Sequence, residues 1–191
     1  MLAFAVRVLP VYLAALCLTA AGWSITLPAP WTAPLVVCVL LLFTTLLTFR
    51  RTPTWSTILL LALALTVGAV IRLMAGAQIA WVPCAAAGLG MPLAGAAIGR
   101  GVPLRRGWVR GGLWALAWIY ILGAWLTPFD MGNLRGLWAG AGLLVFAGLA
   151  VGWFGDWQTR DARDPAGGPA AELYLIGLNL ALAANALASV Q

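Results

Sequence analysis

Few residues of this chain could do chemistry, and most of them lie in one stretch near its end. Residues 152–179 hold Asp156, Asp161, Asp164 and Glu172, which are four of the five acidic residues in the protein. Histidine and lysine are absent, and the eleven basic residues are all arginines. Because arginine stays protonated, the carboxylates are the groups that could bind a cation or exchange a proton.

A nucleophile and a general base cannot be paired from this sequence. Ser24, Ser56 and Ser189 have no histidine or lysine to activate them. No HExxH, GxSxG or phosphate-loop pattern occurs. We therefore predict that the chain is not an enzyme and has no catalytic residues or cofactor. An enzyme that acts on lipid stays a third hypothesis, behind the two given below.

The three cysteines, Cys17, Cys38 and Cys84, lie far apart and within apolar runs. They form no CxxC pair and no cluster with histidine, which are the arrangements that hold zinc or a redox disulfide. We interpret them as small buried apolar residues and predict no certain metal site.

Asp156 and Arg160 stand four residues apart at the end of an apolar run. If the helix continues that far, the two side chains can form an ion pair worth about 0.2–0.5 kcal/mol. Asp161 and Asp164 alternate with arginines just before a Pro-Ala-Gly-Gly-Pro sequence, a pattern typical of a solvated turn. The candidate gate or cation site is therefore assigned to Asp156 and Glu172, with Arg160 as the candidate ion-pair partner.

Glu172 is predicted to open the last apolar segment. A carboxylate there suits the positive end of the helix macrodipole, and that capping role alone could explain it. At about 100° per residue, Glu172, Ile176, Asn179 and Ala183 share one face of a helix. Glu172 and Asn179 could then both face the protein interior, so Asn179 joins the candidate site.

The elements that must position these residues are predicted to be membrane-spanning helices. Hydrophobic residues make up 63% of the chain and charged residues 8%, against about a quarter charged in soluble domains. A helix needs about 20 apolar residues to cross the hydrocarbon core. We predict an all-α integral membrane protein, a single transmembrane domain over residues 1–191 that forms a bundle of seven helices. The predicted spans are residues 8–23, 35–49, 55–74, 79–98, 113–126, 137–154 and 173–190.

The arginines predict the orientation of the bundle. With the N-terminus in the cytoplasm, nine arginines fall on the cytoplasmic side and two, Arg72 and Arg135, on the other side. Cytoplasmic loops carry such an excess of positive charge, so we expect the acidic stretch in the cytoplasm and the C-terminus outside. Topology thus explains the net charge of +6. Without a basic face interleaved with aromatic residues, no nucleic-acid partner is predicted, and the expected partner is the lipid bilayer.

Glycine pairs at GxxxG spacing could bring helices close together. With 22 glycines in the chain, several such pairs arise by chance, and we expect most of them to permit tight packing within the bundle. The pairs are Gly95/Gly99, Gly107/Gly111, Gly136/Gly140 and Gly148/Gly152.

Two segments carry a family resemblance. LLVFAGLAVGWFGDWQ, residues 143–158, and ELYLIGLNLAL, residues 172–182, resemble the sixth and seventh helices of the transmembrane Bax inhibitor motif family, including its small bacterial members. The family's sixth helix ends in Asp-Thr-Gln, and its seventh carries a similar LYLDxxNLF segment. The layout of the earlier spans, including Gly111 and Gly112 at the start of the fifth, agrees more weakly.

The resemblance implies a seven-helix bundle with a central C-terminal helix. It also implies one carboxylate on each of the last two helices, a pair that shares a proton and gates a pH-dependent calcium leak. In this chain those two positions hold Trp153 and Ile176. Asp156 lies three residues after Trp153 and Glu172 four before Ile176, both displaced toward the cytoplasm. A carboxylate pair could persist about one turn, roughly 5 Å, nearer the cytoplasmic mouth.

Two hypotheses follow. In the first, the chain is a Bax inhibitor type protein of the bacterial inner membrane, with Asp156 and Glu172 at a cation-sensitive gate and calcium as the ion that the resemblance suggests. In the second, it is a non-catalytic helical subunit or modulator of a larger membrane complex or membrane protease, since both family carboxylates are replaced. Stoichiometric co-purification of another membrane protein would favour the second.

Overall fold

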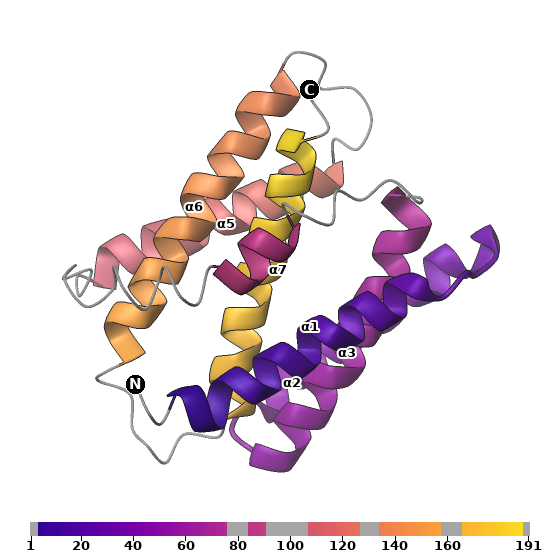
Figure 1. Ribbon diagram of the computed structural model, residues 1–191, viewed down its shortest axis with the longest axis horizontal. Coiled ribbons are helices and arrows are strands. Elements are labelled where there is room, and N and C mark those ends of the chain that lie inside the picture. The colour runs from indigo at the N-terminus through magenta and orange to yellow at the C-terminus, as the bar shows by residue number, and fades with distance from the viewer. Residues whose placement is uncertain (1–3, 76–83, 91–106, 127–133, 158–165, 189–191) are drawn as a thin grey trace. The chain divides into compact units, whose positions relative to one another are not determined.

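The computed structural model describes residues 4–75, 84–90, 107–126, 134–157 and 166–188, and every regular element in these ranges is helical (Figure 1). Five of the helices are long and apolar enough to cross a membrane. The predicted all-α class is therefore confirmed for the described part of the chain. Multiple apolar helices of this length are what a multi-pass membrane protein requires.

The five candidate spans agree with five of the predicted ones to within a few residues, except that the second and the last each start six residues earlier. They are Val6–Ser24, Ala29–Phe49, Pro53–Met74, Gly136–Gly155 and Gly167–Ala188. The corresponding α-helices are α1 Leu9–Ser24, α2 Thr32–Phe49, α3 Pro53–Ala75, α6 Leu134–Trp157 and α7 Gly167–Ala188.

The remaining two predicted spans stay predictions. Of residues 79–98, the structure describes a seven-residue helix at 84–90, and the rest lies outside the described residues. Residues 113–126 fall within α5, Gly107–Leu126, which begins six residues earlier than predicted. The described apolar part of α5 covers Gly111–Ile121.

The chain divides into two compact units, each described here by itself. Unit 1 comprises Met1–Ile79 and Asp161–Tyr174, and unit 2 comprises Ala80–Arg160 and Leu175–Gln191. The boundary falls inside α7, so the first eight residues of this helix belong to unit 1 and the others to unit 2.

In unit 1, α1 and α3 run in the same direction and α2 packs on α3 (Figure 1). Gly68 of α3 meets the backbone of Thr19, and the guanidinium of Arg72 lies 4.8 Å from the ring centre of Trp23. Both pairs are separated by the same number of residues, as parallel helices require. The cation–π contact accounts for Arg72 near the end of a span, because a charge beside an aromatic face is stabilised there.

The buried face of α1 follows a regular spacing. Val8, just before the helix, and Tyr12, Ala15 and Gly22 within it are buried. Their intervals of four, three and seven residues keep one stripe of the helix toward its neighbours. The threonine hydroxyls in the spans donate to backbone carbonyls three or four residues earlier, as Thr66 does to Ala62 at 3.0 Å. Such local bonds satisfy the hydroxyls where no water competes.

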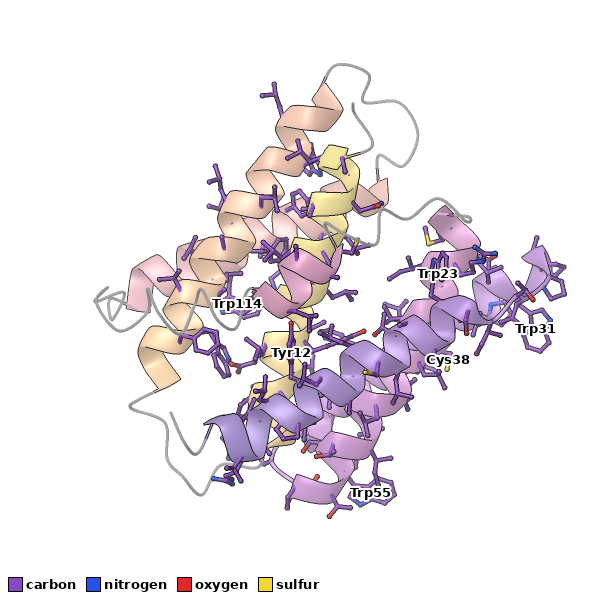
Figure 2. All side chains as sticks on the ribbon, viewed as in Figure 1. Tyr12, Trp23, Trp31, Cys38, Trp55 and Trp114 are labelled. Atoms are coloured by element: carbon purple, nitrogen blue, oxygen red, sulfur yellow. The ribbon has the colours of Figure 1, made fainter. Side chains whose placement is uncertain are left out.

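The tryptophans of unit 1 lie at the two ends of its bundle. Figure 2 shows Trp23 and Trp31 at the end where α1 finishes and α2 begins, and Trp55 at the opposite end, where α3 begins. Trp31 and Trp55 are exposed. Tryptophan is favoured at both membrane–water interfaces, so the positions agree with a bundle that crosses the bilayer.

In unit 2, α5 packs on α6 through aromatic rings. Tyr120 stacks on Trp138 with 5.3 Å between ring centres and meets Phe146 edge-on at 5.6 Å. Gly142 makes room for this cluster, because a β-carbon there would overlap the Tyr120 ring. The short helix 84–90 contacts α7 in the same unit, where Sγ of Cys84 lies 3.5 Å from the carbonyl oxygen of Ala181.

Candidate functional site

Glu172 lies inside a candidate span. It is the sixth residue of α7, it is half-buried, and its neighbours Ala171 and Leu173 are buried. Within the five candidate spans, as far as the structure describes them, it is the only acidic residue. Ionisable groups within a span are costly and are usually retained for function, so Glu172 becomes the leading candidate of the predicted set.

The start of α7 corrects two predictions made for this region. The helix begins at Gly167, where the amide of Ala170 donates to the carbonyl of Ala166 at 3.0 Å. The Gly-Gly-Pro sequence, which precedes the predicted start of the span at residue 173, is therefore the first turn of the helix. Pro169 fits there, because an amide in the first turn has no acceptor within the helix.

The capping explanation for Glu172 is also wrong. The first turn of α7 contains no acidic residue, and the effect of the helix dipole falls off within that turn. Glu172 lies about 7 Å along the axis from the first helical residue, at 1.5 Å per residue. Another reason for a carboxylate at this position is therefore required.

Asp156 lies in the last turn of α6, which ends at Trp157. Arg160 lies outside the described residues, as do Asp161 and Asp164, so the helical Asp156–Arg160 pair stays a prediction. Asp156 belongs to unit 2 and Glu172 to unit 1. Their pairing also stays a prediction.

Asn179 is half-buried on α7, and its Nδ2 donates to the carbonyl oxygen of Leu175 at 2.8 Å. Because the helix is continuous from Glu172 to Asn179, the two residues share one face as predicted, together with buried Ile176. They are about 10 Å apart along the axis, and the amide is already bonded locally. Asn179 and Glu172 do not form a compact pair of ligands.

Trp153 and Ile176, which stand where the resembled family has carboxylates, are both buried in unit 2. The ring of Trp153 packs edge-on against Phe154 with 4.9 Å between centres. Both positions are thus filled by apolar side chains in packed surroundings. A carboxylate introduced at either of these buried positions would lose its hydration.

The described residues do not build a metal cage. No group of three histidine, cysteine or acidic side chains gathers in the part of the chain that the structure describes, and calcium is commonly held by six to eight oxygen atoms. All three cysteines are free thiols. Cys17 is exposed on α1 and Cys38 and Cys84 are half-buried, so the prediction that all three are buried was wrong.

Sequence reasoning missed a set of buried hydroxyl groups in unit 1. Tyr12, Tyr174 and Ser56 are fully buried, and the hydroxyl of Tyr174 lies 2.7 Å from Oγ1 of Thr19. The available signal was a tyrosine well inside a span, since tyrosines usually lie at the interface and a buried hydroxyl requires a partner.

Comparisons of the chain with protein families, with curated proteins and with solved structures found no match.

Proposed function

We propose that this chain is a multi-pass membrane protein of the Bax inhibitor type, in which Glu172 controls a pH-sensitive leak of cations near the cytoplasmic end of α7. Calcium is the proposed cargo, by the sequence resemblance. In this proposal the protein is not an enzyme. It acts by changing the access of ions to a path along α7.

The observation that carries the proposal is the position of Glu172, five residues after the first residue of α7 and inside its candidate span. A charged carboxylate inside a span loses hydration, and such residues commonly mark the pathways that ions take. Neither helix capping nor a turn explains it. The role that we propose for it is in cation passage.

The burial of α7 supports the same proposal. Among the five candidate spans it has the largest share of buried residues, and a central C-terminal helix is what the resemblance implies. Its first half is lined by buried Ala170, Ala171, Leu173 and Tyr174. A half-buried carboxylate in such surroundings can interact with a cation that occupies a narrow path beside it.

The proposed topology has seven spans, with the N-terminus and the linker between α6 and α7 in the cytoplasm of a bacterium and the C-terminus outside. The distribution of arginines supports it, with nine on one side and two on the other. Reporter fusions after Phe49, Leu126 and Gln191 test it. Cytoplasmic signal after Phe49 and external signal after the other two agree with seven spans, whereas a cytoplasmic C-terminus contradicts them.

Calcium flux into proteoliposomes from pH 5 to pH 8 tests the function. We expect flux in the native protein whose pH response is lost in Glu172→Gln, because the amide has the same shape and cannot titrate. Asp156→Asn is expected to reduce that response if the displaced pair exists. Asp161→Asn, a change in the predicted solvated turn, is the matched control. Absence of flux, or the same pH response in Glu172→Gln, refutes the proposal.

A second candidate function is favoured by the burial of Trp153 and Ile176. Apolar packing at both family positions suits a non-catalytic subunit or modulator of a larger membrane complex. Purification in mild detergent would then yield a partner at fixed stoichiometry. The purified chain alone would show no flux at any pH, which separates this candidate from the first.

A further inference from the structure

A hydrogen bond joins α1 to the first part of α7 inside unit 1. The hydroxyl of Tyr174 and Oγ1 of Thr19, 155 residues apart in sequence, are 2.7 Å from one another. Tyr174 is fully buried and lies within a candidate span. In hydrocarbon no water replaces a lost partner, so a hydroxyl buried at this depth needs a protein acceptor.

The direction of this bond follows from the hydrogens available. Oγ1 of Thr19 also lies 2.9 Å from the carbonyl oxygen of Ala15, and a carbonyl can only accept. The single hydrogen of the threonine hydroxyl is thus used, so Tyr174 donates to Thr19. The result is a short directed chain from Tyr174 through Thr19 to the Ala15 carbonyl. Thr19 cannot turn to another partner without losing its bond to Ala15.

The bond lies at one end of residues 167–174, the part of α7 that is fastened to unit 1 by contacts at both of its ends. Gly167 and Gly168 begin α7 in direct contact with unit 1: a β-carbon on Gly167 would overlap Ser56, and one on Gly168 would lie 3.2 Å from the Arg50 carbonyl oxygen. Tyr174 is the last residue of α7 that belongs to unit 1. The helix is therefore held to unit 1 at both ends of residues 167–174, and Glu172 lies between these two attachments.

We propose that the Tyr174–Thr19 hydrogen bond is a positioning device, which holds the first two turns of α7 against α1 and so fixes the depth and exposure of Glu172. Tyr174 and Thr19 act through Glu172 and do not themselves contact the ion. The part that concerns Glu172 rests on the proposed function. The fastening of residues 167–174 does not, and it can be measured by itself.

Hydrogen–deuterium exchange of the full chain in nanodiscs tests the fastening. Tyr174→Phe keeps the ring and removes the donor, and Thr19→Val keeps the shape and removes the acceptor. Each change is expected to raise the exchange rate of amides 170–174 on the order of fivefold, which is the change expected from losing one ordinary buried hydrogen bond. The double variant should exchange no faster than either single variant, and Thr19→Ser should restore native exchange.

Tyr120→Phe in unit 2 is the matched control, because it removes a tyrosine hydroxyl elsewhere and should leave exchange of residues 170–174 unchanged. Native exchange in both Tyr174→Phe and Thr19→Val would overturn the inference, as would full additivity in the double variant. The calcium-flux pH profile then separates the two proposals. If the native chain conducts, Tyr174→Phe should move the pH midpoint while Glu172→Gln abolishes the response. If it does not conduct, the exchange result still decides the fastening.

Discussion

The backbone of Gly68 in α3 packs directly against the carbonyl group of Thr19 in α1. The contact is reciprocal, because at the same crossing Gly22 of α1 meets the backbone of Leu65 and lies close to Ala69. Two glycines thus allow the two helices to touch backbone to backbone. In a membrane, such close packing is a main source of helix association, because lipid removes the hydrophobic driving force.

Alanine at either glycine should therefore destabilise unit 1. A β-carbon at Gly22 or Gly68 would overlap backbone atoms, which cannot rotate away as the end of a side chain can. We expect Gly22→Ala and Gly68→Ala each to lower the free energy of unfolding by about 1–3 kcal/mol, the usual range for overpacking. Unfolding in mixed detergent micelles, followed by circular dichroism, measures this loss.

Gly140→Ala is the control for that experiment. It lies in a GxxxG pair of α6, and a β-carbon there would meet nothing within 4 Å. We expect it to be neutral or slightly stabilising, because alanine favours the helix more than glycine does. A loss at Gly140 as large as that at Gly68 would contradict the assignment of the close contact to α1 and α3.

The positions of most spans could be predicted from sequence, because length and apolar composition suffice to define a helix in lipid. Trp23 and the proline-rich sequence after it correctly marked the end of α1, as Arg50 and Pro53 marked the turn between α2 and α3. The start of α7 was predicted six residues late. Gly167 and Pro169 are typical of turns, but both are also compatible with the first turn of a helix.

The contacts between helices could not be predicted in the same way. In a span nearly every residue is apolar, so the pattern does not show which face meets a neighbour. The GxxxG spacing drew attention to Gly111 and Gly140, which have open space, and away from Gly22 and Gly68. The Thr19–Tyr174 bond depends on a pairing across 155 residues, which a single sequence does not contain.

Introducing a carboxylate at Ile176 should make stability depend on pH. The side chain is buried, with 1% of its surface exposed, so Ile176→Asp places an acid where its charged form is poorly solvated. The neutral acid is tolerated better, and it predominates at low pH. We expect this variant to melt at a higher temperature at pH 5 than at pH 8, whereas Ile176→Asn, of equal size and uncharged, should show no such difference.

The thermal unfolding of both variants in nanodiscs measures this effect. Equal melting temperatures of Ile176→Asp at the two pH values would mean that water or a cation reaches position 176. That outcome would indicate a water-accessible path beside the middle of α7.

Two leucines distinguish packing against protein from packing against lipid. Leu60 of α3 is fully buried, whereas Leu41 of α2 is 62% exposed, and both lie in candidate spans. Leu60→Ala removes contacts and leaves a cavity, so we expect a loss of about 2–5 kcal/mol in the free energy of unfolding. Leu41→Ala exchanges one lipid-facing apolar surface for another and should stay within about 0.5 kcal/mol of the native value. Unfolding in mixed detergent micelles measures both variants. A large loss in the free energy of unfolding of Leu41→Ala would mean that the exposed face of α2 packs against protein.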